Sequence, residues 1–210
     1  MSTLINILTR TSRRPKFFEV CKNSIENQTY KNIRHIICID NDESEEYVKG
    51  LDFIRVHKKT LPNNATIDGH KEIVKPYNLY FNDLLSEVEG GWVMFMDDDD
   101  CFMDNGCLQI IADNAINSRA LFWKVYITSK QIVPRSPISK THPPVWCDVS
   151  TLGFLVPESF TGSLVWDGYS RCDYRVATQL YNLAPSIKYI DKILTRTQMG
   201  PNSGRNTDRK

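Results

Sequence analysis

The sequence predicts an α/β protein: one domain with a mostly parallel central sheet and helices on both faces. Three observations predict this class. Short runs that are apolar throughout alternate with segments in which apolar residues recur at helical spacing. The chain has 210 residues, 41% of them hydrophobic, which suits a single domain with a sizeable core. Polar residues follow several apolar runs, at the edge of the sheet where α/β proteins bind ligands.

Five apolar runs predict the main strands of this sheet. Each run is rich in branched or aromatic residues and is bounded by polar or turn-forming residues. The predicted strands cover residues 4–8, 33–39, 51–56, 92–96 and 120–128. Residues 151–195 are expected to add short strands. Two segments without periodicity, 58–70 and the proline-rich 134–150, are predicted loops.

Stripes of apolar residues predict the helices between these strands. The first helix begins at Pro15, because proline is tolerated in the first turn of a helix. Asp104 could cap the third helix, since aspartate favours that position. The other predicted helices cover residues 73–88, 108–116 and 171–183. The first 130 residues therefore read β-α-β-(α)-β-α-β-α-β, where (α) is the acidic segment between the second and third strands.

Charge and cysteine usage exclude several classes. Lysine plus arginine number 26 against 25 acidic residues, so the net charge of +1 gives no reason to expect nucleic-acid or membrane-surface binding. The six cysteines form no CxxC pair and are expected to be reduced, mostly buried thiols. No run has the order of a signal peptide or the length of a membrane span. We expect a soluble, cytoplasmic protein, or one module of a longer chain.

An apolar strand that runs into four consecutive aspartates, Asp97 to Asp100, is the strongest functional signal. Four adjacent carboxylates repel one another and cannot enter a core unpaired. A divalent cation bound at the ligand-binding edge of the sheet would remove the repulsion. The competing interpretation is a solvated acidic turn that ends in a helix cap.

Two other readings of the run are weaker. A calcium loop counted back from Gly106 would need an acid where Met103 stands. A phosphatase of the haloacid dehalogenase type would use Asp97 as nucleophile and Asp99 beside it. That motif usually opens its domain, however, and here Cys101 replaces the usual threonine or valine. The phosphatase stays open as an alternative.

The order of motifs along residues 4–183 resembles the GT-A glycosyltransferases of family 2. Each motif is weak by itself, but their order and spacing together are fairly specific. The chain has a threonine-containing turn, an Arg-Pro, a Gln-Thr-Tyr and an aspartate after the second strand. An asparagine-containing helix, the acidic strand end and an acid at a late helix start follow. The matching residues are Thr11, Arg14-Pro15, Gln28-Thr29-Tyr30, Asp40, "KPYNLYFNDLL", "WVMFMDDDD" and "SRCDYRVATQL".

The resemblance implies where a nucleotide-sugar donor binds. Asp40 would accept the uracil N–H and so select a UDP-sugar. Asp97 and Asp98 would contact the nucleotide, and Lys75 or an arginine near the end of the chain (Arg196, Arg205) would serve the diphosphate. The complete set of nucleotide candidates is Thr9, Arg10, Thr11, Asp40, Lys75, Asn78, Asp97 and Asp98.

The resemblance also implies a metal and a general base. Asp97 and Asp99 would ligate Mn²⁺ or Mg²⁺, since both ions prefer hard oxygen ligands. Asp98 and Asp100 are the alternative ligands, because a run of four aspartates leaves the register open. Asp173 would take the proton from an acceptor hydroxyl, with Asp167 as second choice. The competing role for Asp173 is structural, because Ser170 and Asp173 have the spacing of a capping box.

The chain departs from the family pattern at three places. Cys172 replaces the glutamate that usually precedes the base, and Tyr77 replaces the basic residue that usually precedes the helix asparagine, Asn78. No histidine follows His142 to act as a late metal ligand. Gln198 or water would take that histidine's place. The aromatic residues Trp146, Phe154, Trp166 and Tyr169 could stack on an acceptor sugar, although core packing explains most of them.

The sequence therefore predicts a hexosyltransferase (EC 2.4) that moves a sugar from a UDP-sugar to a hydroxyl of a carbohydrate or glycoconjugate. A single in-line displacement with Asp173 as base would invert the anomeric centre. The GT-A domain is expected over residues 1–195, with a nucleotide part at about 1–100 and an acceptor part at about 101–195. Residues 196–210 form a polar tail. Besides the phosphatase, a non-catalytic nucleotide-sugar-binding domain is the alternative.

Overall fold

The protein is built on one nine-stranded, mostly parallel sheet. The computed structural model describes residues 3–63, 65–116, 119–128 and 131–198. Along the sheet the order is β3 (Phe53–Arg55), β2 (Ile33–Ile39), β1 (Ile5–Thr11), β6 (Trp92–Phe95), β10 (Phe154–Val156), β8 (Arg119–Thr128), β11 (Ser186–Thr197) and β7 (Asp100–Phe102). The ninth strand, β9 (Gln131–Val133), pairs with β8.

Strand directions divide the sheet into two parallel groups. Strands β3, β2, β1 and β6 are parallel, and so are β8 and β11. Strand β10 lies antiparallel between β6 and β8, and β7 and β9 are antiparallel to their own partners. The predicted class, an α/β protein with a mostly parallel sheet, is confirmed.

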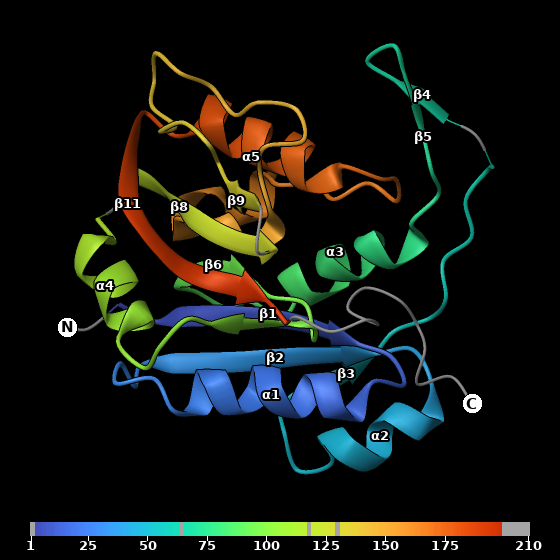
Figure 1. Cartoon of the computed structure of the whole chain (residues 1–210). Coiled ribbons are helices and arrows are strands. Elements are labelled where there is room, and N and C mark those ends of the chain that lie inside the picture. Colours follow the sequence, from blue (N-terminus) through green and yellow to red (C-terminus); the bar gives the residue numbers. More distant parts are fainter. Residues whose placement is uncertain (1–2, 64, 117–118, 129–130, 199–210) are drawn as a thin grey trace.

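Helices cover both faces of this sheet (Figure 1). Helices α3 (Tyr80–Leu85) and α5 (Cys172–Leu183) pack on the face that contains Leu8 and Phe95. Helices α1 (Pro15–Glu26) and α4 (Cys107–Asn114) pack on the other face, with Ile7 and Met94. Neighbouring residues of one strand thus feed opposite cores, because successive side chains of a strand point to opposite faces. The short α2 (Asp42–Val48) packs against α1 and β2 at the β3 end of the sheet.

The predicted helix over 73–88 is wrong in its first half. Pro76 begins a 3₁₀ turn (Pro76–Leu79), and the α-helix proper is only α3. Proline disfavours helical backbone in the residue before it, so the chain is not helical at Lys75 (φ −135°, ψ 66°). Ile73, placed by its spacing on the buried stripe, is 67% exposed.

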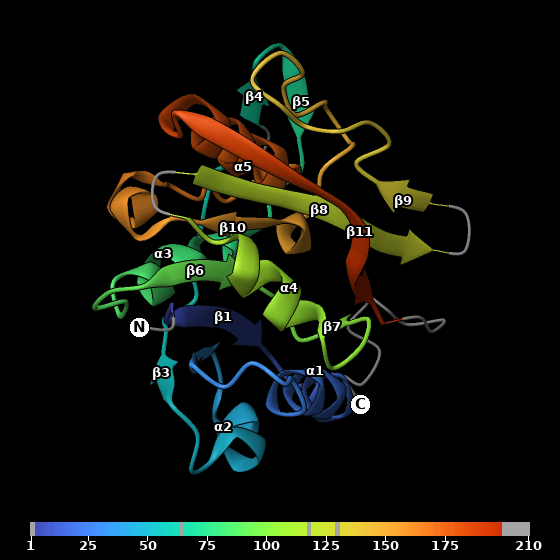
Figure 2. The same cartoon turned by 90° about the vertical axis from the view of Figure 1, so that its left-hand side faces the viewer.

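Other boundaries also differ from the prediction. The predicted loop 58–70 contains most of a small hairpin, β4 (Ala65–Ile67) and β5 (His70–Glu72), which stands apart from the main sheet in both views (Figures 1 and 2). The cap of α4 is Gly106, not Asp104, whose carboxylate instead accepts from the Gly106 N–H at 2.8 Å. Strand β11 continues two residues into the predicted polar tail; residues 199–210 of that tail lie outside the described chain.

The long β11 crosses the molecule and bends (Figure 2). Its pairing with β8 shifts register between Ile190 and Ile193 and again between Ile193 and Thr195. Such irregularities bend a strand and increase its twist. The far end of β11 then pairs with β7, which also packs against α1.

Two further observations concern location and redox state. Within the described ranges, every helix is too short or too polar to cross a membrane. All six cysteines are free thiols; Cys147 is exposed and the other five are buried.

Candidate active site

A cavity of about 390 Å³ opens at the carboxyl ends of the parallel strands β1, β2 and β6. This is the edge at which open α/β sheets bind their ligands. Cationic, anionic and aromatic side chains share its walls. The lining residues are Arg10, Thr11, Ser12, Arg14, Asp40, Lys75, Tyr77, Tyr80, Asp97, Asp98 and Asp99.

Arg10 and Asp97 form a two-pronged ion pair at the centre of this cavity. Arg10, the sixth residue of β1, donates from Nε to Oδ1 at 2.5 Å and from Nη2 to Oδ2 at 2.8 Å. Its Nη1 donates to the Asn78 side chain at 2.8 Å, and the guanidinium lies over the rings of Tyr77 and Phe81. Burial alone would lower the pKa of Arg10, but the Asp97 carboxylate outweighs burial and raises it. Asp97 is therefore fixed in position by a permanent cation.

Asp98 is directed away from the other three aspartates. It is 4% exposed, accepts from the Thr11 hydroxyl at 2.7 Å and pairs with Arg14. Burial raises the pKa of Asp98 to about 7, although the Arg14 charge opposes the shift. Arg14 also reaches Asp99 at 3.0 Å, so it joins the second and third aspartates.

Asp97, Asp99 and Asp100 converge on one point. One carboxylate oxygen from each lies within 4.8 Å of the other two. Asp100 is buried, and burial followed by repulsion from Asp99 and Asp97 raises its pKa well above the usual value. Three hard oxygen donors that repel one another suit Mg²⁺ or Mn²⁺, which would relieve the repulsion. The residues present thus fit the metal, and of the two alternative ligands Asp100, not Asp98, lies with Asp97 and Asp99.

Asp40 lines the cavity at the end of β2, as predicted for a nucleoside-binding acid. It accepts hydrogen bonds from the Asn41 side chain at 2.6 Å and from the Tyr80 hydroxyl at 3.2 Å. Burial alone would raise the pKa of Asp40, but bonds from Ser12, Asn41 and Tyr80 outweigh it and lower the pKa. Asp40 is therefore an ionised acceptor at neutral pH.

The two threonines of β1 occupy different environments. Thr11 lines the cavity, whereas Thr9 is fully buried and outside its lining. The Thr9 hydroxyl lies 3.0 Å from Nε2 of His35, beneath the ring of Phe18. Burial lowers the pKa of His35 to about 4, so its ring is neutral. Thr9 therefore stabilises the end of β1 from inside the core.

Lys75 and Asn78 enter the site in different ways. Lys75 lines the cavity and its ammonium lies 5.8 Å from the ring of Tyr77. Asn78 is 8% exposed and lies behind the wall, where it accepts from Arg10 and donates to the Tyr169 carbonyl at 2.7 Å. Asn78 thereby connects the central ion pair to the segment that precedes α5.

Asp173 lies in the first turn of α5, where its carboxylate accepts from the Tyr174 N–H at 2.9 Å, but the Ser170 half of the capping box suggested by the sequence does not form. The N-cap is Arg171, with a left-handed φ of 56° and no side-chain cap. The Ser170 hydroxyl bonds to Glu72 instead. Burial raises the pKa of Asp173 to about 6, and the charge of Asp97 adds to the shift. Asp173 is outside the cavity lining, yet close enough to Asp97 to sense its charge.

The other candidates near the base and the metal are held by protein contacts. Asp167 forms a two-pronged pair with Arg175, at 2.5 and 2.7 Å. The Gln198 amide donates to the carbonyls of Phe17 and Asp98, and its backbone N–H donates to the Asp99 carbonyl. Gln198 thus stabilises the loop of the four aspartates through hydrogen bonds to its backbone. Arg196 lies beside Cys101, outside the cavity lining, and Arg205 is outside the described residues.

Sequence reasoning missed several residues of the site. Ser12, Arg14, Tyr77 and Tyr80 line the cavity without having been candidates. The sequence did offer a signal for Arg14, because this residue follows β1, whose carboxyl end lies at the same cavity as the aspartates. Of the proposed acceptor aromatics, Phe154 and Trp166 are core residues at 0% and 1% exposure. Trp146 is partly exposed and stacks on His70, with ring centroids 4.3 Å apart.

The chain matches known proteins by its structure but not by its sequence. No family model matches the chain, and neither does any curated protein sequence. Solved structures match over nearly its whole length. Staphylococcus aureus TarS residues 1–349 in complex with UDP-GlcNAc superposes with a TM-score of 0.68 at 17% identity, covering 94% of this chain. The mannosyltransferase PcManGT from Pyrobaculum calidifontis, in complex with GDP-Man and Mn²⁺, has a TM-score of 0.62 at 12% identity and 96% coverage.

The chain spans only part of these structures: 59% and 58% of the two complexes, and 37% of a longer TarS structure. Identities this low carry the fold alone. The chain has the GT-A fold of the nucleotide-sugar transferases.

Proposed function

We propose that the protein is a metal-dependent glycosyltransferase that transfers a hexose from a UDP-sugar to a hydroxyl of a carbohydrate or glycoconjugate. The observation that carries the proposal is the convergence of Asp97, Asp99 and Asp100 at a cavity that also contains cationic side chains. Carboxylates that collect a cation and cations that collect phosphates suit a nucleoside diphosphate with its metal. The bound UDP-GlcNAc, GDP-Man and Mn²⁺ of the two structural neighbours support this choice.

The donor would occupy the cavity with its ends recognised by different groups. Arg14 and Lys75 line the wall and would pair with diphosphate oxygens. Asp40, an ionised acceptor, would bind the uracil N–H. Asp97 and Asp99, with Asp100, would hold Mn²⁺ or Mg²⁺, and the ion would supply Lewis acidity at the diphosphate of the departing UDP.

Asp173 would serve as the general base. Its carboxylate would take the proton of the acceptor hydroxyl while that oxygen attacks the anomeric carbon. The bond from that carbon to the diphosphate oxygen breaks, and UDP leaves with the electron pair. Attack opposite the leaving group inverts the anomeric centre. The raised pKa of Asp173, about 6, keeps the carboxylate ionised at neutral pH yet basic enough to accept the proton.

A phosphatase that uses Asp97 as nucleophile has less support. The acidic run follows β6, well into the chain, whereas the phosphatase motif usually opens its domain. A non-catalytic nucleotide-sugar-binding domain would use the same cavity, so only an assay of turnover separates it from an enzyme.

Thermal unfolding with UDP and Mn²⁺ tests the donor site. A ligand at 100 times its Kd stabilises the native state by about 2.7 kcal/mol, or about 5–10 °C in Tm for a chain of this length. Asp99→Ala should lose the metal-dependent part of this shift. Asp113→Ala, on the exposed surface of α4, is the matched control and should keep it.

Slow hydrolysis of a panel of sugar nucleotides, followed by release of the nucleoside diphosphate, tests catalysis. Hydrolysis of one donor that Asp173→Asn abolishes would support the transferase. Binding of UDP without turnover of any donor or acceptor would favour the non-catalytic domain. Release of phosphate from a generic ester without a response to UDP would favour the phosphatase.

A further inference from the structure

Two segments far apart in the sequence are fastened together between the donor cavity and α5. Residues 72–75 begin at the last residue of β5, and residues 168–171 precede α5. The Lys75 N–H donates to the Gly168 carbonyl at 2.7 Å, and the Ser170 N–H donates to the Ile73 carbonyl at 2.8 Å. Val74 and Tyr169 form an antiparallel bridge between these bonds. We call this pairing of residues 72–75 with 168–171 the clamp.

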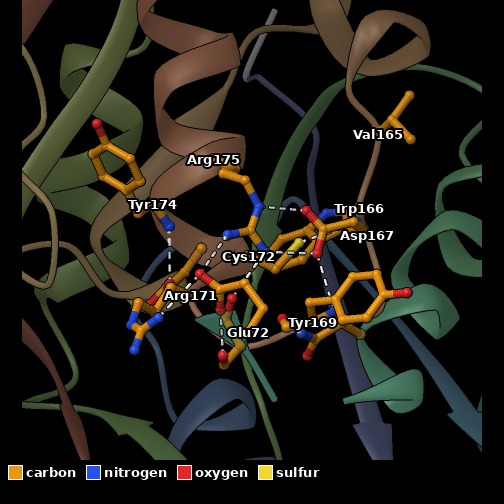
Figure 3. Close-up of polar contacts among 12 residues, drawn as sticks. Glu72, Val165, Trp166, Asp167, Tyr169, Arg171, Cys172, Tyr174 and Arg175 are labelled. Carbon is orange, nitrogen blue, oxygen red and sulfur yellow. Dashed lines mark hydrogen bonds and ion pairs between the residues drawn. The ribbon is translucent and has the colours of Figure 1, made fainter. Parts of the chain in front are cut away.

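A buried carboxylate lies at one end of the clamp. The Glu72 side chain has 0% exposure, and its oxygens accept from the Ser170 hydroxyl and from Nη1 of Arg171 at 3.0 Å. Arg175 approaches the same carboxylate at 3.5 Å. Figure 3 shows the Arg175 guanidinium between Glu72 and Asp167. An ionised carboxylate is costly to bury unless its partners are well placed, so this contact is specific to one arrangement of the two segments.

The clamp continues directly into the donor side of the cavity. Lys75 is its last residue in the first segment and lines the cavity. Three residues later, Asn78 accepts from Arg10, which holds Asp97. Asn78 also donates back to the carbonyl of Tyr169, inside the second segment. A displacement of residues 72–75 would therefore reach the central ion pair.

The clamp continues equally directly into the helix that carries the proposed base. Arg171 contacts Glu72 and is the N-cap of α5, two residues before Asp173. Its left-handed backbone, at φ 56°, is uncommon for a residue with a side chain and needs support from its surroundings. Arg171 also lies 4.9 Å from the ring of Trp146, which holds it from the outer side.

We propose that Glu72 is a positioning residue for the transfer reaction: its buried carboxylate fixes the first turn of α5 against residues 72–75 and thereby fixes Asp173 relative to Asp97. The proposal rests on the proposed function, because it assigns Asp173 the role of base. A misplacement of about 1 Å between reacting groups reduces rates by up to about 100-fold. Glu72 thus acts at a distance, without touching donor or acceptor.

The first test compares Glu72→Gln and Glu72→Asp in the complete chain, with donor hydrolysis as the assay. Glu72→Gln removes the charge at nearly constant shape and should lower kcat about 10- to 100-fold, while KM for the donor changes less than about 3-fold. Glu72→Asp restores the charge and should recover part of kcat. The control is Glu26→Gln on α1, an exposed partner of Lys22, which should leave both constants unchanged. A folded Glu72→Gln with kcat within 2-fold of wild type would overturn the proposal.

Ser170→Ala keeps the proposal testable if Glu72→Gln does not fold. This variant removes the hydroxyl bond to Glu72 and the acceptor of the Ile73 N–H at 3.0 Å, while both arginines still pair with the carboxylate. We expect it to fold and to lower kcat more than it changes the donor KM. A loss of stability with unchanged kcat would mean that the clamp only holds the fold together.

Hydrogen exchange supplies a readout that does not depend on turnover. In the wild type, UDP with Mn²⁺ should slow exchange at residues 75–78 and also in the first turn of α5. In Glu72→Gln only the donor side should respond. If the wild type neither binds UDP nor hydrolyses a donor, the proposed function fails. Hydrogen exchange of the wild type and of Glu72→Gln, compared without ligand, then tests whether Glu72 holds the two segments of the clamp together. Faster exchange in both segments of the variant would support it, and faster exchange in one segment alone would contradict it.

Discussion

At Asp173, burial determines what the carboxylate can do. Its pKa is raised to about 6, so the proportion of ionised base falls on acidification through that value. Only the ionised form can accept a proton from a hydroxyl. We therefore expect kcat/KM to be nearly constant above about pH 7 and to fall about tenfold per unit below about pH 6. Asp173→Asn should lower the rate about 10²–10⁴-fold and remove this acid limb.

Donor binding must be measured over the same pH range, because Asp98 in the cavity has a pKa of about 7. If UDP affinity in the presence of Mn²⁺ changes little between pH 5 and 8 while the rate falls, the limb belongs to Asp173. An acid limb that persists in Asp173→Asn would assign it to another group.

Arg10 is the residue on which the cavity wall depends most. It pairs with Asp97 and contacts Asn78 and two aromatic rings, with a side chain only 12% exposed. Arg10→Met keeps the length but leaves Asp97 without its cation among other carboxylates. We expect the free energy of unfolding, measured with urea and EDTA, to fall by about 2–4 kcal/mol.

Arg34→Met provides the matched control for this measurement. Arg34 and Asp52 are 2.9 Å apart, like a strong pair, but they are 34% and 47% exposed. Solvent screens such pairs, so a loss of about 0–1 kcal/mol is expected. Equal losses in the two variants would show that the position of Arg10 in the cavity adds nothing to its pair.

Single residues also mark where sequence reasoning stops. The acidic run and Asp40 could be assigned to the site because each follows an apolar strand. The roles within the run could not be separated, since they depend on tertiary partners: Thr11 and Arg14 bind Asp98, whereas Asp100 points toward Asp97 and Asp99. Thr9 and Thr11 look equivalent in the sequence, and only their tertiary partners distinguish them: Thr9 lies beside His35, whereas Thr11 donates to Asp98.

At the scale of elements, α3 is fixed to the sheet by aromatic rings. The ring of Phe95 on β6 lies 5.0 Å from Phe81 on α3, 4.9 Å from Trp166 and 6.0 Å from Phe154. Phe95 has 0% exposure and ends the strand that leads to the aspartates. Phe95→Ala would leave a cavity among rigid rings, which cannot collapse easily. We expect a loss of about 3–5 kcal/mol in urea unfolding.

Val165→Ala is the control at this scale. Val165 is the neighbour of Trp166 in sequence but is 62% exposed. Its truncation should change the free energy of unfolding by no more than about 0.5 kcal/mol. A comparable loss in both variants would mean that the effect does not come from the aromatic cluster.

The elements show why periodicity is a partial guide. The strands β1, β2, β6 and β8 were predictable because buried parallel strands are apolar throughout. The start of α3 was not, because Ile73 and Tyr77 have helical spacing by coincidence and Pro76 limits the preceding backbone. The clamp was unpredictable, since a glutamate is buried only where two arginines from a distant helix meet it.

At the scale of the molecule, the two cores share the same strands. One core contains Leu180 of α5 and the other Leu108 of α4, and β1, β6 and β8 contribute to both. Loss of either core would expose one face of every central strand. We therefore expect a single unfolding transition, with coincident curves from far-UV circular dichroism and tryptophan fluorescence. Leu108→Ala and Leu180→Ala should each lower the midpoint of this transition. Each should reduce the free energy of unfolding by about 2–5 kcal/mol, and the two losses should add in the double variant.

Separate transitions, each sensitive to one of the two variants, would show that the faces unfold independently.

The fold class itself needed no tertiary information, because alternation of apolar strands and amphipathic segments defines it. The order of the sheet beyond β6 did need it: β10 and β7 are three-residue strands with little pattern of their own.

The bend of β11 has a consequence for how far the chain can be altered. Strands β6 and β7 are four places apart in the sheet, about 19 Å if the sheet were flat, yet only residues 96–99 connect them. That connection also contains a turn, in which the Asp100 N–H donates to the Asp97 carbonyl at 3.0 Å. Because the sheet curls, the strands β6, β10, β8, β11 and β7 form a ring, and the acidic run is the shortest connection that closes it. A single added residue there would relax the closure and spread the carboxylates, whereas the β4–β5 hairpin lies outside the ring and leaves room for insertions.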